Sequence, residues 1–274
     1  MLKEAADATR ELAVVNYENW KRTYGMAQVA LTKRYSGSAL GVAWAVIRPA
    51  IYITAYWFAV SIGLKGGHAQ GMGGAPYIIW LVPGNIAWFF MSDCLREAGQ
   101  AIRRNSQFVT KMSYPVATLP VSEVLSHFLV HLVMVCLTLV LLLVSGFGLT
   151  LTALQLPYYM LCGLALSVVV STLFSALTAI SADLGQLIKS VLSLLFWVTP
   201  VLWSASTLSA PFRYLIMANP LTYVISGYRD SLVMHNWITG SLNYTAYFWG
   251  LLAVLTLVSS YVFTKLAPEF ADVL

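Results

Sequence analysis

The chain has 274 residues, of which 59% are hydrophobic and only 10% are charged, and its formal net charge at pH 7 is +5. Water-soluble domains carry about 25% charged residues, so this composition excludes a soluble enzyme and indicates a surface that mostly faces lipid. The basic residues lie beside apolar segments and form no basic run, so the positive charge does not indicate a nucleic-acid partner.

Residues 1–35 precede the first apolar stretch and mix aromatic, aliphatic and charged side chains. This mixture, with Trp20 and Tyr24 among basic residues, predicts an amphipathic helix in the membrane interface, with the rings at headgroup depth. A helix surrounded by water is the alternative interpretation. No apolar core precedes a cleavage site, so the segment does not resemble a signal peptide.

Apolar runs of about 20 residues can cross a bilayer, and the sequence predicts six spans in an all-α integral membrane protein. The first covers residues 40–64, and a glycine-rich loop follows at 65–76. The one charged residue of this span, Arg48, has two interpretations. Its side chain reaches the cytoplasmic interface, or it faces a polar cavity and meets an anionic substrate.

The second span covers residues 77–91, where Pro83 predicts a kink or a break. Residues 93–114 are polar and basic and fit a short amphipathic helix. The third and fourth spans are expected at residues 121–144 and 158–181. The polar stretch therefore joins the second span to the third on one side of the membrane.

Residues 181–190 form a short polar segment, after which a fifth span begins near Val191 and is interrupted by Pro200. Residues 204–246 mix apolar, aromatic and polar side chains and are too long for a turn. They predict re-entrant helices that enter the membrane from outside and return. The sixth span covers residues 247–264.

The distribution of Lys and Arg orients this six-span frame. One side carries twelve of the 16 basic residues, namely Lys3, Arg10, Lys21, Arg22, Lys33, Arg34, Arg96, Arg103, Arg104, Lys111, Lys189 and Lys265. The other side carries three, Lys65, Arg213 and Arg229, and Arg48 lies within a span. Because basic residues concentrate on the cytoplasmic side, both termini are expected in the cytoplasm. The chain then divides into a cytoplasmic and interfacial segment (1–35), a membrane domain (36–266) and a cytoplasmic tail (267–274).

No motif for ATP or metal binding is present. The sequence contains no Gly-Lys dipeptide and so lacks a phosphate-binding P-loop, which places any ATP and Mg²⁺ on another chain. The cysteines, Cys94, Cys136 and Cys162, form no CxxC pair, which argues against a disulfide framework or a zinc site. We therefore expect no catalytic residue, metal or cofactor on this chain.

Glu123, His127 and His131 recur at intervals of four and would share one face of a helix. Ionisable groups inside a membrane are often functional, so a metal site or a proton relay is one interpretation. The other, favoured because no third strong ligand is evident, leaves both histidines neutral and hydrogen-bonded to neighbouring helices. Glu123 would then pair with a nearby basic residue: Arg103, Arg104 or Lys111.

Four segments carry a resemblance to a known family. They are KRYSGSALGVAWAVIRPAIY at 33–52, FWVTPVLW at 196–203, NPLTYVISGYRDSL at 219–232 and APEFADVL at 267–274. Together they resemble the membrane subunits of ABC exporters of the type-2 permease family, in the branch that exports polysaccharides, O-antigens and teichoic acids. The order of the motifs and the six-span frame agree with that family along nearly the whole chain.

The resemblance implies that two copies of this permease join two copies of a separate cytoplasmic ABC ATPase in a bacterial cytoplasmic membrane. Residues 99–107 would form the main coupling helix, seated in a cleft of the ATPase, and residues 183–189 a second contact. The candidate coupling residues are Gly99, Gln100, Arg103, Arg104, Asn105, Gln107, Asp183 and Gln186.

The resemblance also implies that a lipid-linked polysaccharide or polyol-phosphate polymer crosses between the two permeases, along the first and fifth spans. Aromatic rings would provide sliding contacts for sugars, and basic residues would meet an anionic phosphate. The candidate path residues are Lys33, Arg34, Trp44, Arg48, Tyr52, Tyr56 and Trp197. For Tyr52, Tyr56 and Trp197, packing within the bundle is the simpler interpretation.

Three other classes compete with this interpretation. A permease of the same broad family that exports a drug or a small lipid would share the topology and the ATPase. A membrane-embedded transferase would need a catalytic cluster, for which Glu123, His127 and His131 are the candidates. An ion-coupled transporter would need charges in mid-membrane and often an inverted repeat, and neither is visible.

Overall fold

The computed structural model describes residues 2–63, 73–110 and 114–274, which contain many helices and no β-strand. Among them, five helical segments are long and apolar enough to cross a bilayer: Gly41–Gly63, Tyr77–Arg104, Thr118–Val144, Leu151–Ile180 and Ile238–Val273. The chain is therefore an all-helical protein with the spans of a membrane protein, as its composition predicts.

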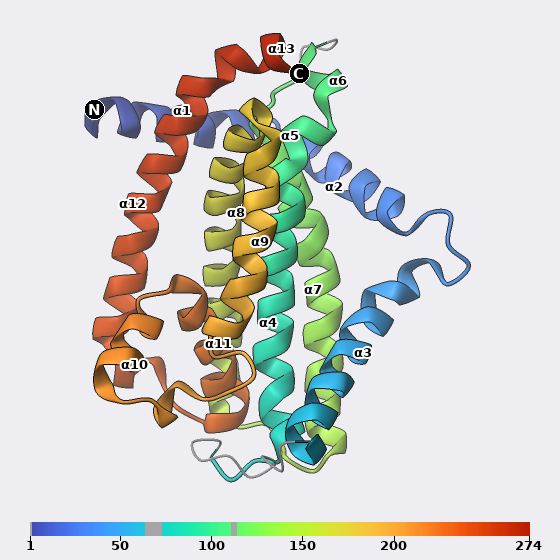
Figure 1. Cartoon of the computed structure of the whole chain (residues 1–274), viewed down its shortest axis with the longest axis vertical. Coiled ribbons are helices and arrows are strands. Elements are labelled where there is room, and N and C mark those ends of the chain that lie inside the picture. The colour runs from blue at the N-terminus through green and yellow to red at the C-terminus, as the bar shows by residue number, and fades with distance from the viewer. Residues whose placement is uncertain (1, 64–72, 111–113) are drawn as a thin grey trace.

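A further apolar helix, α9 (Ala182–Val198), is 17 residues long and runs beside α4 (Tyr77–Glu97) and α8 (Leu156–Ile180) (Figure 1). It begins at Ala182, so the prediction of a polar segment followed by a span from Val191 is wrong at this point. Only Ser181 separates α8 from α9. The polar residues belong to the exposed face of the first turns of α9, which in sequence looks the same as a loop.

The helix α4 lies at the centre of the bundle. In the most apolar stretch of Tyr77–Arg104, which contains α4, 83% of the residues are buried. In that of Gly41–Gly63, at the edge of the bundle, 11% are buried. The helix packs against α7 (Thr118–Val144), α8 and α11 (Pro220–Arg229). Burial from several sides explains why α4 is hydrophobic around its whole circumference rather than along one stripe.

Pro83 lies inside α4 without ending it. Proline removes a backbone donor, and inside a membrane the freed carbonyls need other partners. Side chains act nearby: Nδ2 of Asn85 donates to the Leu81 carbonyl at 3.1 Å, and Nε of Arg229 donates to the Trp80 carbonyl at 3.3 Å. The helix is continuous through the proline, so the predicted break does not occur.

Residues 2–35 form two helices, α1 (Leu2–Glu18) and α2 (Trp20–Tyr35), rather than one. In Figure 1, α1 lies across one end of the bundle, where it packs against α12 (Leu242–Leu266), and α2 packs against α7. The helix α3 (Trp44–Phe58) slants away from the bundle axis. Both chain termini lie at the same end of the molecule (Figure 1).

At the end that holds the termini, α4 continues through a 3₁₀ turn, η3 (Ala98–Gln100), into the short helices α5 (Ala101–Arg104) and α6 (Ser106–Thr110). These short pieces replace the single amphipathic helix expected at 93–114. At the opposite end, α7 stops before Gly146, which has a φ of +73°. Glycine adopts this left-handed conformation readily and commonly ends helices.

Two short helices follow α9 at the opposite end, α10 (Ala210–Met217) and the largely buried α11. The side chain of Asn219 caps α11 by accepting a hydrogen bond from the Leu221 backbone N–H at 3.0 Å. Pro220 occupies the first turn, where its missing N–H is tolerated. The sequence prediction of helices within 204–246 is confirmed, and their depth in a membrane stays a prediction.

Candidate functional site

A cavity of about 1090 Å³ lies among α2, α3, α4, α7 and α9. All seven residues that the sequence proposed for a transport path line it: Lys33, Arg34, Trp44, Arg48, Tyr52, Tyr56 and Trp197. They come from the consecutive helices α2 and α3 and, far along the chain, from α9. The structure thus brings the candidates together, while their contact with a substrate stays a prediction.

One side of the cavity is aromatic. The ring of Tyr56 lies 6.1 Å from that of Tyr52 and 5.2 Å from that of Phe196, and Phe196 also lies 5.6 Å from Trp88 (centroid distances). Trp197 is 68% exposed, which is a large fraction for a tryptophan. Tyr56 therefore packs against neighbouring rings while it lines the cavity, and Trp197 is available for a contact outside this chain.

The cavity wall carries more positive than negative charge. Six basic residues line it, Lys33, Arg34, Arg48, Arg96, Arg104 and Lys189, against three acidic ones, Asp93, Glu97 and Glu123. Arg48 is exposed and forms no ion pair with any residue that the structure describes. Arg48 lines the cavity, and both of its interpretations, reach to the interface and contact with an anionic substrate, stay predictions.

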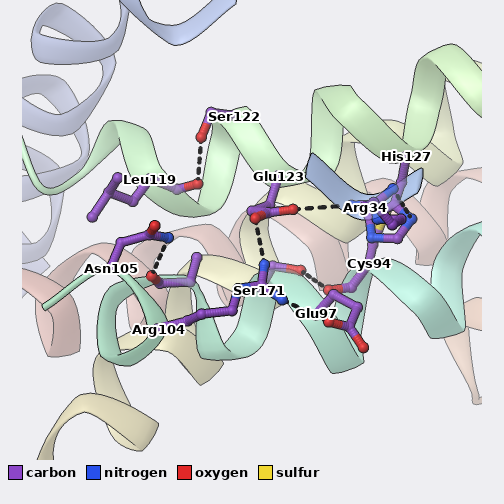
Figure 2. A network of polar contacts seen from close by, with 11 residues as sticks. Arg34, Cys94, Glu97, Arg104, Asn105, Leu119, Ser122, Glu123, His127 and Ser171 are labelled. Atoms are coloured by element: carbon purple, nitrogen blue, oxygen red, sulfur yellow. Dashed lines mark hydrogen bonds and ion pairs between the residues drawn. The ribbon is translucent and has the colours of Figure 1, made fainter. Parts of the chain in front are cut away.

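A network of ion pairs lies at one edge of this wall, and Figure 2 shows Glu123 between two arginines. Nη2 of Arg34, at the end of α2, donates to Oε2 of Glu123 at 3.0 Å. Arg104, on α5, donates to Oε1 of the same carboxylate and, at 2.7 Å, to Glu97. The predicted pairing of Glu123 with Arg104 is confirmed, Arg34 is an unpredicted second partner, and Lys111 lies outside the described residues.

Both histidines of α7 contact neighbouring helices. Nη1 of Arg34 lies 3.3 Å from Nδ1 of His127, which accepts the hydrogen bond if its proton is on Nε2. Nε2 of His131 lies 2.6 Å from the hydroxyl of Tyr228 on α11. The described residues include no group of three or more His, Cys, Asp or Glu that could hold a metal ion. The arrangement is that of structural hydrogen bonding rather than a ligand set.

Tyr35 ends α2 and also lines the cavity. Burial raises the pKa of its hydroxyl, and the adjacent Arg34 guanidinium partly opposes that rise. The tyrosine therefore stays neutral at physiological pH and presents a hydrogen-bonding group beside the basic residues.

The candidate coupling residues gather at the end of the bundle that holds the termini. Gln100 lies beside the first turns of α9, since a Cβ on Gly185 would be 3.7 Å from its side chain. Four of the eight candidates are exposed and form no ion pair with a described residue: Arg103, Gln107, Asp183 and Gln186. Gly99 is buried against Phe174, and Arg104 is held by Glu97 and Glu123. The two predicted contact segments are therefore neighbours, with different exposure within each.

Sequence reasoning missed several residues of the cavity wall: Trp88, Phe89, Asp93, Arg96 and Lys189. Asp93 and Arg96 form an ion pair of 3.1 Å at i and i+3 on α4. An acid and a base three apart at the end of an apolar helix could have indicated them. Nothing local in the sequence indicates that Trp88 and Phe89 face a cavity.

Comparison with known proteins agrees with this architecture. The family described as ABC-2 type transporter matches residues 23–233, and the chain belongs to that family. This confirms the resemblance recognised in the sequence.

The relatives carry more specific names. The chain is 26% identical over 249 residues to an O-antigen export system permease protein RfbA of Klebsiella pneumoniae, covering 89% of this chain and 91% of that protein. It is 25% identical over 212 residues to the protein of the same name from Myxococcus xanthus, covering 77% of this chain and 79% of that protein.

Proposed function

We propose that the chain is the membrane subunit of an ATP-driven exporter that moves a lipid-linked polysaccharide or polyol-phosphate polymer, of the O-antigen, capsule or teichoic acid type. The observation that carries the proposal is the cavity of an ABC-2 family member, which joins an aromatic side to a basic wall. Aromatic rings suit the apolar faces of sugars, and guanidinium groups suit phosphate. The names of the relatives point to the same class of substrate.

In this proposal α9 is the fifth of six spans of a membrane domain at residues 36–266. Residues 1–35 lie in the cytoplasmic interface, residues 267–274 form a cytoplasmic tail, and α10 and α11 form the re-entrant helices on the outside. The excess of Lys and Arg at the end with both termini supports a bacterial cytoplasmic membrane orientation with the termini inside.

A separate ABC ATPase supplies the energy, with ATP and Mg²⁺ bound to that chain and no cofactor on this one. The absence of a P-loop in the sequence supports this division. Two permeases and two ATPases form the complex. The ATPase contacts the exposed coupling residues Arg103, Gln107, Asp183 and Gln186. Gly99, Gln100 and Asn105, which are buried or half-buried, and Arg104, which is held by Glu97 and Glu123, support that surface.

The transport path follows α3 and α9. An anionic group of the substrate meets Lys33, Arg34 and Arg48, and the sugars slide past Trp44, Tyr52, Tyr56 and Trp197. ATP binding draws the ATPases together, and the coupling segments carry that movement into the spans.

Co-expression with an ABC ATPase from the same organism tests the proposal. The purified chain alone should hydrolyse no ATP, and a stable complex of two permeases and two ATPases should hydrolyse it. Cells that lack the permease should lose surface polysaccharide and keep the lipid-linked precursor inside. If the complex hydrolyses ATP but cells that lack the permease keep normal surface polysaccharide, export of a drug or a small lipid is favoured instead.

Arg48→Ala tests the basic wall. We expect export to fall about tenfold, the effect of losing one hydrogen bond between a charged donor and an anion, with normal expression. Arg22→Ala is the matched control, because Arg22 is an exposed arginine of α2 that does not line the cavity. Normal export by Arg48→Ala at normal expression would remove Arg48 from the path.

A further inference from the structure

Glu123 is the most buried charged residue of the cavity wall. Its side chain is 8% exposed, against 23% for Arg34 and 40% for Arg104. A carboxylate in such a position needs charged partners, because an unpaired buried charge is strongly unfavourable. The two arginines supply them from two different elements, α2 and α5.

The partnership of Arg34 has a consequence for the cavity. Arg34 lines the cavity, and one of its terminal nitrogens is already bound to Glu123 at 3.0 Å. A phosphate that approached this wall would find Lys33 and Arg48 without acidic partners among the described residues, but Arg34 shared with a carboxylate. The phosphate and Glu123 then compete for the same guanidinium, because a planar carboxylate and a tetrahedral phosphate can each accept its paired N–H donors.

We propose that Glu123 is an internal competitor that occupies Arg34 and sets how tightly the cavity holds the anionic group of its substrate. The proposal rests on the proposed function, because it takes the substrate to be anionic. Glu123 is a positioning residue: it acts through Arg34 and does not itself bind the substrate. Its advantage for an exporter is release, since a substrate held by a fully free basic wall would leave slowly.

Substitutions of the two partners of the ion pair should change the affinity for an anion in opposite directions. Glu123→Gln keeps the shape and removes the competing charge, so it should tighten anion binding about tenfold. Arg34→Gln removes the shared cation and should weaken binding by a similar factor, about tenfold. A purely structural role for Glu123 would weaken binding in both variants or change it in neither.

The experiment uses the full-length chain in complex with its ATPase, in phosphatidylcholine nanodiscs without nucleotide. The probe is farnesyl diphosphate, an amphiphile with an anionic head, and titration calorimetry gives its Kd. Farnesol, which has the same tail without the charge, should bind equally to all variants. The thermal midpoint of each variant reports whether it is folded.

Glu97→Gln is the matched control. Glu97 lines the same cavity and pairs with Arg104, but it does not contact Arg34. Removing this more exposed charge should change the Kd less than about twofold, as for other exposed ion pairs. If Glu97→Gln and Glu123→Gln lower the Kd equally, the cause is the lower negative charge of the wall as a whole. That result would contradict competition for Arg34.

The remaining outcomes separate the two proposals. If the unmodified complex binds farnesyl diphosphate and Glu123→Gln leaves the Kd unchanged or raises it, the competition is wrong and the proposed function stands. If neither the unmodified complex nor the Glu123→Gln complex binds the diphosphate, the proposal of an anionic substrate is wrong. Should Glu123→Gln fail to fold, Glu123→Asp keeps the charge but draws the carboxylate back by one methylene, and it should tighten binding about threefold, a smaller effect than full removal of the charge.

Discussion

At the scale of single residues, Arg229 has an unusual environment for a charged side chain. It is 5% exposed, and its guanidinium carbon lies 3.4 Å from the centroid of the Trp80 ring. It donates to the carbonyls of Trp80 on α4 and of Pro200 and Val201 after α9. One side chain thus joins α4 to the segment that follows α9 by donating to carbonyls of both.

Replacing Arg229 should therefore destabilise the fold. Arg229→Gln cannot reach all three carbonyls, and we expect a loss of roughly 3 kcal/mol or more, because several buried acceptors lose their donor. Thermal unfolding in detergent measures the effect. Arg213→Gln on α10 is the control, since the Arg213 side chain has no hydrogen bond to a described residue, and an equal fall in both variants would contradict the assigned role.

Gly227 lies where two helices pack too closely for a larger side chain. A Cβ at this position of α11 would overlap the ring of Tyr159 on α8. We expect Gly227→Ala to lower stability by about 1–3 kcal/mol through overpacking, measured as a lower thermal midpoint. Gly250→Ala is a matched helical control, because nothing lies within 4 Å of a Cβ built there, and it should be neutral or slightly stabilising.

At the scale of elements, the structure places the two expected coupling segments side by side. Sequence motifs named them separately, and the approach of Gln100 to Gly185 depends on how α8 and α9 turn at Ser181. The exposed residues of both segments therefore form one surface.

Photo-crosslinking tests this surface. A benzophenone amino acid at Gln107 or Asp183 should crosslink to the ATPase, since both side chains are exposed at the end with the termini. The same group at Leu154, which is 75% exposed at the opposite end, should not. Crosslinks from Leu154 but not from Gln107 would reverse the orientation of the molecule.

At the scale of the whole molecule, both termini and the excess of basic residues share one end of the bundle. The positive-inside rule then orients the protein as a unit, because the sidedness of one loop determines that of the others. The shallow burial of Gly41–Gly63, at 11%, leaves α3 with an apolar surface that lipid or a second permease must cover.

Thiol labelling in intact cells tests this orientation. Lys3→Cys and Asp272→Cys should react with a membrane-impermeant maleimide only after lysis, whereas Leu154→Cys should react in intact cells. The unmodified chain measures the background from its three cysteines, of which Cys94 and Cys162 are buried. Labelling of Lys3→Cys in intact cells would place the termini outside.

The class of the protein followed from the sequence by itself. Span length and apolarity are local properties, because the bilayer demands about 20 apolar residues per crossing and helical hydrogen bonds within each segment. The membrane class was therefore readable without coordinates, and the absence of a Gly-Lys dipeptide was read directly from the sequence. The chain order of basic and apolar residues also predicted that both termini share one side.

Only the tertiary structure decided which distant groups meet. Glu123 pairs with Arg34, 89 residues away, and Arg229 reaches carbonyls that follow α9, because helix packing rather than local pattern sets these neighbours. The start of α9 at Ala182 was equally hidden, since polar residues on an exposed helical face resemble a loop. Buried charges select partners through three-dimensional proximity, and the sequence specifies that proximity only through the whole fold.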